Sequence, residues 1–385
     1  MPDAVIVDVV RTPIGRAFKG SLAGERAEDL AAFAIKTLVE KYKDAVAPED
    51  YDEVIMGVGF PDNEQGYNVG RNAWLLAGYP ESVPGHIVSR FCASSVQSIR
   101  AAANAIKAGD GEIYLAGGLE ASSRAAGNSD FVPHPKLDGS EGSLWNVYIP
   151  MGITAENVAE RYGVSREAQD EFAARSQQLA VEGQENGFWD REITPYTTAD
   201  GTVVAKDDGP RAGTTVEKLA GLNPVFKPEG GTVTAGNACP LNDGAAAALI
   251  MSAEKAAELG LKPRAKIVAS VAGGVEPEYM GVGPIPAVKE LLKRTGMTAG
   301  DIDLVEVNEA FAAQVLPSID ELGFEIDKVN VQGGAIAVGH PFGMTGARIM
   351  GTLLNNLETN DKQFGLETMC VAGGQGMAII VERLN

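Results

Sequence analysis

Apolar residues recur along the chain at two spacings, and together they predict alternating strands and helices. Residues 4–10 (AVIVDVV) and 53–59 (EVIMGVG) are short apolar runs typical of buried strands. Residues 27–42 carry apolar side chains three and four positions apart, which is the spacing of one helix face. A second helix is expected over 93–107 and a strand over 113–117. This alternation predicts a mainly parallel sheet covered by helices.

The same order of elements returns in the last third of the chain. Strands are expected over 265–274, 303–311, 366–374 and 376–384, and helices over 284–296 and 343–357. Residues 50–60 (DYDEVIMGVGF) match residues 301–311 (DIDLVEVNEAF) in pattern, since each stretch follows a helix and an acidic turn. The match lies in the order of elements rather than in shared letters. We therefore expect two halves built on one plan.

The region from about residue 120 to 245 differs from both halves. Clusters of Gly, Pro and Asp surround two polar helical stretches, ENVAERYG and the residues that follow Ser165. Long ordered loops in a compact enzyme often carry ligand contacts. We expect an insertion with long loops between the two halves.

Composition narrows the class of protein. The 385 residues are 45% hydrophobic and 22% charged, enough for a substantial core in two or more units. The 52 acidic and 32 basic residues give a net charge of -20, which disfavours nucleic acid or an anionic membrane as the main partner. A well-solvated acidic surface explains this charge, and a high-salt habitat is the alternative. The sequence has no membrane-spanning apolar run and no signal-peptide order, so we expect a cytoplasmic protein.

The chain has three cysteines, Cys92, Cys239 and Cys370, and none stands at metal-ligand spacing from another Cys or from a His. We therefore expect neither a disulfide framework nor a metal site. Cys92 lies in SRFCASSVQSI, where a strand-like segment passes into a helix. The free amides and the dipole of a helix N-terminus favour an anion and would lower the pKa of this thiol. A buried, inert cysteine is the alternative.

Three further stretches carry groups suited to chemistry. His340 lies in GGAIAVGHPFG, where a ligand can approach the backbone and the imidazole can act as a base; a tight turn is the alternative. Cys370 begins CVAGGQG, whose turn amides are able to cradle an oxyanion, although a hairpin explains the glycines equally well. Asn308 and Glu309 end an apolar run, and ligands gather at strand ends in α/β folds. Together these residues indicate one shared site, suited to acyl transfer through a thioester.

Seven stretches, in their order along the chain, resemble the thiolase family, the acetyl-CoA acyltransferases. They are RFCASSVQSI, AGGLEASS, PMGITAENVAERYGVSREAQDEFAARSQ, GTVTAGNACPLNDGAAA, VNEAFAAQ, GGAIAVGHPFGMTGAR and MCVAGGQGMA. The resemblance implies an α/β thiolase fold, with two similar βαβαβαββ halves in a layered α/β/α/β/α arrangement and an inserted loop domain. The implied division is an N-terminal half of residues 1–119 and 246–262, a loop domain of 120–245 and a C-terminal half of 263–385.

The resemblance also implies a role for each candidate residue. Cys92 corresponds to the nucleophile that carries the acyl group, and Cys370 to the thiol that moves the proton at the substrate α-carbon. His340 corresponds to the residue that activates the nucleophile and helps to bind a thioester oxygen, at a site where Asn308 holds a water. The amides of Cys92 and Ala372 form the second oxyanion hole.

Coenzyme A is expected as a substrate, with no permanently bound cofactor. The resemblance places Arg211 near the adenine and the phosphates, where it supplies a local cation for a polyanionic ligand. A solvated loop arginine is the alternative. The residues placed along the pantetheine channel are Met151, Phe226, Ala235, Ala238, Cys239 and Phe311.

Four residues depart from the family pattern. Cys239 replaces a frequent serine, Ala372 a common glycine, and Ser89 a usual asparagine. Pro150 stands where acetoacetyl-specific biosynthetic members often carry a histidine, which favours the degradative type of enzyme.

The resemblance therefore implies an acetyl-CoA C-acyltransferase that cleaves 3-ketoacyl-CoA with CoA through a Cys92 acyl-enzyme, as in β-oxidation. A biosynthetic acetyl-CoA C-acetyltransferase that makes acetoacetyl-CoA is one alternative, and a non-catalytic acyl-CoA-binding homologue is another. Ketoacyl synthases of fatty-acid synthesis use one cysteine with two histidines, which the CVAGGQG stretch disfavours. The family also implies a homo-oligomer, a dimer or a tetramer, in association with other β-oxidation enzymes.

Overall fold

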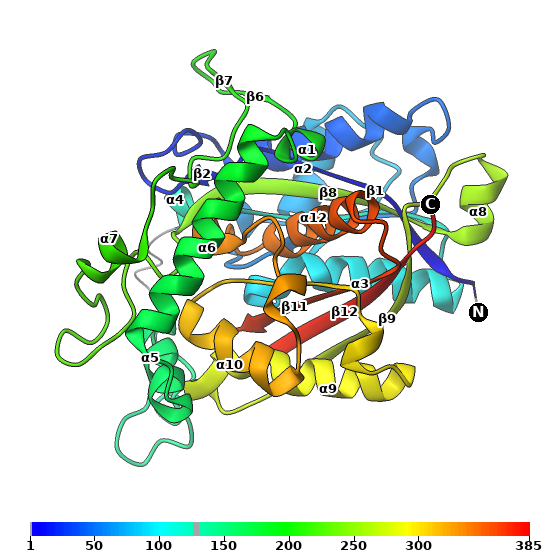
Figure 1. The fold of residues 1–385 in the computed structure, drawn as a ribbon. Helices are drawn as coiled ribbons and strands as arrows, with labels where there is room; N and C mark the ends of the chain where they lie inside the picture. The colour runs from blue at the N-terminus through cyan, green and yellow to red at the C-terminus, as the bar shows by residue number, and fades with distance from the viewer. Residues whose placement is uncertain (1, 126–130) are drawn as a thin grey trace.

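Ten strands form one mixed sheet in the computed structural model, which describes residues 2–125 and 131–385 (Figure 1). They are β1 (Ala4–Arg11), β2 (Gly15–Arg16), β3 (Glu53–Val58), β4 (Gly85–Val88), β5 (Ile113–Ala121), β8 (Asn242–Ser252), β9 (Ala265–Gly274), β10 (Leu304–Val307), β11 (Phe364–Val371) and β12 (Gln375–Arg383). The sheet runs in the order β10-β11-β12-β9-β1-β8-β5-β3-β4, and β2 pairs with β8. A separate ribbon joins β6 (Tyr196–Thr197) to β7 (Val203–Val204).

The helices follow the apolar spacings of the sequence. They are α1 (Ala27–Tyr42), α2 (Val69–Leu76), α3 (Ser94–Ala108), α4 (Ser122–Ala125), α5 (Met151–Tyr162), α6 (Arg166–Glu185), α7 (Val216–Ala220), α8 (Ala253–Glu258), α9 (Pro284–Thr295), α10 (Ala312–Leu322), α11 (Ala335–Val338) and α12 (Thr345–Thr359). The helix predicted over 27–42 is confirmed, and Leu30 and Ile35 lie on its buried face. The start of α6 follows from Ser165, whose hydroxyl accepts a hydrogen bond from the Ala168 amide.

The two halves repeat one pairing scheme, as the order of elements predicts. In the first half β3 runs parallel to β4 and β5, and β8 runs antiparallel to β5 and β1. In the second half β10 runs parallel to β11, and β12 runs antiparallel to β11 and β9. Residues 50–60 and 301–311 accordingly contain equivalent strands, β3 and β10. The half-sheets join edge to edge, where β1 and β9 pair over two residues each.

The prediction of a mainly parallel sheet is wrong, because six of its nine strand pairs are antiparallel. Only residues 372–374 connect β11 to β12, and a parallel connection needs a crossover of about a dozen residues or more. β8 enters the sheet from the long insertion rather than from a crossover helix. The alternation of strands and helices therefore does not fix the direction of these two strands.

The helices divide the molecule into five layers (Figure 1). α12 lies in the middle, in contact with α3 and with strands of both halves. One buried cluster fills this central layer and includes Ile6, Ile99 and Met350. α1 covers the outer face of the first half-sheet, and α9 and α10 cover that of the second, each face with a buried cluster of its own. The layered α/β/α/β/α arrangement is confirmed.

The segment between β5 and β8 contains α5, α6, α7 and the β6–β7 ribbon, and buried charges attach it to β1. The Arg11 guanidinium donates to Glu192 Oε1 at 2.8 Å and to Asp207 Oδ1 at 2.8 Å. All three side chains are almost fully buried, so this part of the insertion belongs to the folded core. Within residues 2–125 and 131–385, none of the helices combines the length and the hydropathy that a membrane crossing requires.

Candidate active site

Cys92 lies on a sharp turn between a strand and a helix. β4 ends at Val88, a single 3-10 turn covers Phe91–Ala93, and α3 begins at Ser94. Phe91 has a left-handed backbone conformation (φ 45°), which is rare for an aromatic residue and marks a constrained turn. The Cys92 thiol that follows is buried.

Burial controls the protonation of the Cys92 thiol. It raises the pKa of Cys92 well above its usual range, and the nearby Cys370 and Glu120 act in the same direction. The amides of Cys92 and Ala372 favour the thiolate but are outweighed. The prediction of a lowered pKa is therefore wrong, because the cost of burying the charge exceeds the stabilisation that these two amides give. Cys92 needs a base before it can act as a nucleophile.

His340 is buried and neutral. Burial lowers the pKa of its imidazole to about 3, and Arg348 adds to the effect. Nδ1 lies 2.6 Å from Thr345 Oγ1, and that hydroxyl donates to the Pro341 carbonyl at 2.8 Å. Because a hydroxyl has one proton, we assign Nδ1–H as the donor to Thr345, which leaves the lone pair on Nε2. Nε2 is therefore the basic nitrogen of this imidazole.

Asn308 places the end of β10 against His340. Its Nδ2 lies 3.2 Å from His340 Nε2, and its backbone carbonyl accepts a hydrogen bond from Gln314 of α10 at 3.0 Å. Its Oδ1 is buried without a hydrogen-bond partner among the residues that the structure describes. The His340 amide donates to Asn242 Oδ1 at 2.8 Å, so strands of both halves hold the imidazole. The neighbouring Glu309 instead accepts hydrogen bonds from Ser176 of α6 and from Asn330, which lies between α10 and α11.

Cys370 lies on β11 next to the end of the strand. It pairs with Gly376 across the hairpin and is fully buried. Burial raises the pKa of its thiol to about 12, and the nearby Cys239 contributes further. Cys370 is therefore a protonated thiol at neutral pH, a group that can give up a proton to a strong base.

The turn between β11 and β12 carries Ala372 toward Cys92. Gly373 and Gly374 have left-handed conformations (φ 77° and 80°), so the glycines of CVAGGQG serve the hairpin. The Ala372 amide lies close enough to the Cys92 thiol to favour its thiolate. The same turn thus both closes the hairpin and directs the Ala372 amide toward the Cys92 thiol.

Aromatic rings connect the His340 turn to the Cys92 turn. Phe342 lies edge-on to His340, with ring centroids 5.0 Å apart. Phe60 lies edge-on to both Phe342 and Phe91, at 5.6 Å from each. Since Phe91 directly precedes Cys92, these contacts bring the imidazole turn and the thiol turn together.

Most of the residues expected along the pantetheine channel pack into one cluster with Cys370. Those in the cluster are Met151, Ala238, Cys239 and Phe311. The ring of Phe226 lies 6.2 Å from that of Phe311. Ala235 and Arg211 are exposed, and the Arg211 amide donates to Gln177 on α6. The structure therefore gathers four of the six residues expected along the channel and leaves Ala235 and the arginine on the surface.

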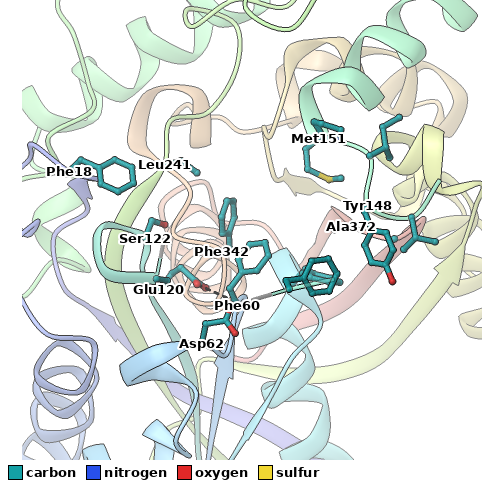
Figure 2. Close-up of a pocket in the computed structure, with 17 residues that line it drawn as sticks. Phe18, Phe60, Asp62, Glu120, Ser122, Tyr148, Met151, Leu241, Phe342 and Ala372 are labelled. Atoms are coloured by element: carbon teal, nitrogen blue, oxygen red, sulfur yellow. Dashed lines mark hydrogen bonds between the residues drawn. The ribbon is translucent and has the colours of Figure 1, made fainter. Parts of the chain in front are cut away.

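A cavity of about 730 Å³ opens beside these turns (Figure 2). Its wall includes Phe91, Phe342 and Ala372, which adjoin the Cys92 and His340 turns. The other lining residues are Phe18, Phe60, Asp62, Glu120, Ser122, Ala125, Phe131, Val147, Tyr148, Ile149, Pro150, Met151, Leu241 and Gly373. Most of this wall is apolar. Sequence reasoning missed the cavity, because its residues come from separate loops that share no periodic pattern.

Glu120 is a second feature that sequence reasoning missed. It lies next to the end of β5, fully buried in the cavity wall (Figure 2), and burial raises the pKa of its carboxyl to about 7. Ser89 holds the segment that follows β3, because its hydroxyl donates to the Gly59 carbonyl at 3.1 Å. The available signal was a carboxylate within the apolar stretch IYLAGGLEA. Glu120 accepts hydrogen bonds from Gly59 N (2.8 Å), Phe60 N (3.2 Å), Gly343 N (2.9 Å) and Gln65 Nε2 (2.6 Å).

A buried thiol on a strand-to-helix turn, a second buried thiol and a neutral imidazole, set between two repeated halves, define the cysteine-dependent acyltransferases of this fold. The family models for the thiolase N-terminal and C-terminal domains match residues 4–254 and 261–383, and the chain belongs to the thiolase family. It is 46% identical, over 391 residues and all of both chains, to the 3-ketoacyl-CoA thiolase of Idiomarina loihiensis and equally to that of Salmonella choleraesuis. It is also similar to the crystal structure of the Bacillus anthracis acetyl-CoA acetyltransferase, with a TM-score of 0.90 and 40% identity over 100% of this chain and 99% of that one.

Proposed function

We propose that this chain cleaves 3-ketoacyl-CoA with CoA, giving acetyl-CoA and a shortened acyl-CoA. The observation that carries the proposal is the apolar cavity beside the Cys92 turn, whose volume of about 730 Å³ suits an extended acyl group. The acyl part of acetoacetyl-CoA would leave most of this space unfilled and would bury little apolar surface. The names of the relatives from Idiomarina and Salmonella support the same substrate.

In the first half-reaction, His340 Nε2 takes the proton of the Cys92 thiol, and the thiolate attacks the C3 carbonyl. The bond between C2 and C3 then breaks, the acyl group stays on Cys92 Sγ as a thioester, and acetyl-CoA departs as an enolate. The enolate carbon takes the proton of Cys370. The raised pKa of Cys370, about 12, keeps that proton in place until the enolate forms.

In the second half-reaction, the Cys370 thiolate takes the proton of the CoA thiol, and the CoA sulfur attacks the acyl-enzyme. Cys92 leaves as a thiolate and recovers its proton from the His340 imidazolium. Oxyanions form at the tetrahedral adducts and at the enolate. The amides of Cys92 and Ala372 serve one of these anions, and His340 with a water held by Asn308 serves the other, at a typical gain of about 3 kcal/mol for each donor.

The proposal also covers the location of the enzyme, its oligomeric state, its use of cofactors and its domains. We propose a cytoplasmic enzyme of β-oxidation that works as a homo-oligomer, takes CoA as a substrate and keeps no permanent cofactor. β4 is the last strand in the sheet order, and such an edge strand is a place where a second copy can pair. We also propose that residues 120–245 act as a loop domain between an N-terminal half of 1–119 and 246–262 and a C-terminal half of 263–385, and that Arg211 faces the CoA nucleotide.

Steady-state cleavage of acetoacetyl-CoA and of 3-ketodecanoyl-CoA tests the proposal. We expect CoA-dependent turnover of both substrates, with kcat/KM about tenfold or more higher for the longer one, since additional CH₂ groups are buried. Cys92→Ser should lower turnover by about a thousandfold or more and abolish the acyl-enzyme mass shift. Cys370→Ser is the matched cysteine variant, and it should still become acylated while failing in proton transfer.

Two outcomes would replace the proposal with an alternative. Turnover of acetoacetyl-CoA without turnover of the longer substrate would indicate the biosynthetic acetyltransferase, which the similarity to the Bacillus anthracis enzyme favours. Binding of acyl-CoA without CoA-dependent cleavage of either substrate would indicate a non-catalytic homologue.

A further inference from the structure

Arg90 connects the Cys92 turn to the opposite half of the molecule. It stands two residues before Cys92, and its amide donates to Ser94 Oγ at 2.9 Å. Its Nε donates to Gln97 Oε1 of α3 at 3.0 Å, and its NH1 donates to Gln375 Oε1 of β12 at 2.8 Å. One guanidinium therefore holds a helix of the first half and a strand of the second half. The planar fork of arginine suits this double contact, and a lysine ammonium does not.

Gln375 continues the connection to the turn that faces Cys92. Its Oε1 accepts from Arg90, and its Nε2 donates to the Ala372 carbonyl at 3.3 Å. Ala372 is followed by two left-handed glycines, Gly373 and Gly374, which have more backbone freedom than other residues. The side-chain amide of Gln375 thus adds a side-chain restraint to a glycine-containing turn.

The two ends of this connection meet at the Cys92 thiol. One end is the constrained turn of Phe91, which has a positive φ, and the other is the Ala372 amide, which favours the thiolate. These groups belong to different halves, and their relative position depends on contacts across the boundary. We propose that Arg90 and Gln375 are positioning residues that hold the Ala372 amide against Cys92 across that boundary.

The pH dependence of Cys92 alkylation by iodoacetamide, followed at the Cys92 peptide by mass spectrometry, tests this role without any turnover. In Arg90→Lys and in Gln375→Met the Ala372 amide should no longer be held, and the midpoint should rise by about one pH unit or more, the loss of one hydrogen bond to a thiolate. Cys370 on β11 and Glu120 on β5, which also raise the pKa of Cys92, are unchanged in both variants. Arg100→Lys, at a half-buried arginine of α3, is the matched control and should leave the midpoint unchanged.

The double variant tests whether Arg90 and Gln375 act through the same connection. Arg90→Lys with Gln375→Met should shift the midpoint no further than either single change, because each breaks the same connection. Where the chain turns over, kcat should fall about tenfold while the KM for CoA stays within about twofold.

An unchanged midpoint in the single variants, or additive shifts in the double variant, would overturn the positioning role. The kinetic readout rests on the proposed function, and the alkylation readout does not. Failure of the unmodified chain to cleave 3-ketoacyl-CoA would therefore refute the proposed function alone, and the alkylation profile would still decide the role of Arg90 and Gln375.

Discussion

At the scale of single residues, Thr345 decides which nitrogen of His340 is basic. Thr345→Val removes the acceptor for Nδ1–H and leaves this buried donor without a partner. The imidazole should then shift toward the Nε2–H tautomer, which cannot take the Cys92 proton. We expect the rate of acyl-enzyme formation to fall about 10- to 100-fold, by analogy with other residues that orient a reacting imidazole. Single-turnover acylation with 3-ketodecanoyl-CoA measures this rate.

Thr345→Ser is the control for that change, because it keeps the hydroxyl that accepts from Nδ1 and donates to Pro341. Its acylation rate should stay within about threefold of the unmodified chain. Thermal unfolding of both variants separates a lost base from a lost fold. A Thr345→Val protein that acylates at the unmodified rate would contradict the tautomer assignment.

Sequence motifs could single out the candidate side chains but not their surroundings. Cys92, Cys370 and His340 stand in glycine-rich or helix-initiating stretches that are visible in the chain. Thr345 and Asn242 are ordinary residues in the sequence, and their contacts with His340 depend on the fold. The direction of the Cys92 pKa shift was predicted wrongly for the same reason, since the dipole is visible in the sequence and the depth of burial is not.

At the scale of elements, the crossing of α3 and α12 sets the distance between the two reactive turns. Cys92 lies two residues before α3, and His340 lies five residues before α12. The helices meet closely at Gly346, where an added Cβ would lie 2.6 Å from the Val96 amide nitrogen and 3.0 Å from Ser95 Oγ. The same crossing carries a hydrogen bond from the Ala347 amide to Ser95 Oγ at 2.8 Å. A side chain at Gly346 must therefore push one helix away from the other.

Gly346→Ala should destabilise the protein by about 1–3 kcal/mol, because the clash is with backbone and exceeds the gain in helix propensity. It should also slow acylation, since both reactive turns move with their helices. Gly351→Ala lies on the same helix, and its added Cβ would meet a methyl of Val9 at 3.3 Å, so we expect a change within about 1 kcal/mol. Denaturant unfolding of the two variants checks this, and equal stabilities would contradict the close crossing.

Periodicity predicted where the elements lie better than how they pair. The helix over 27–42 and the helix after Ser165 follow from apolar spacing and a capping side chain, which are local properties. The expected strand over 303–311 ends at Val307, although the Asn308 amide still donates to the Thr368 carbonyl of β11 at 3.0 Å. Strand direction depends on connections that span the whole insertion, and no local pattern encodes it.

At the scale of the whole molecule, buried carboxyls make stability depend on pH near neutrality. Burial raises the pKa of Glu120 to about 7 and that of Glu306 to about 8, against a usual value of about 4.3 in an unfolded chain. Glu306 lies beside Glu367 in the paired register of β10 and β11, and burial also raises the pKa of Glu367. The folded chain therefore retains protons that the unfolded chain has lost.

The number of protons bound in each state determines whether the free energy of unfolding rises or falls with pH. Between about pH 4.3 and 8 the folded state binds more protons at these carboxyls than the unfolded state does, so the free energy of unfolding falls as pH rises. His340 acts oppositely, because its pKa is lowered to about 3 and its contribution is lost as pH falls below about 6.5. From about pH 6.5 to 8 the buried carboxyls dominate these opposing effects.

We expect Glu120 and Glu306 to decrease the free energy of unfolding by about 2 kcal/mol between pH 6.5 and 8, and Glu367 to add to this decrease. Glu306→Gln keeps an acceptor for the Asn356 side chain, removes one titrating proton and should flatten this decrease. Glu254→Gln, at an exposed position of α8, removes the same charge and should leave the slope unchanged. Denaturant unfolding at a series of pH values measures this slope. An identical slope for Glu306→Gln and the unmodified chain would show that Glu306 does not cause the pH dependence.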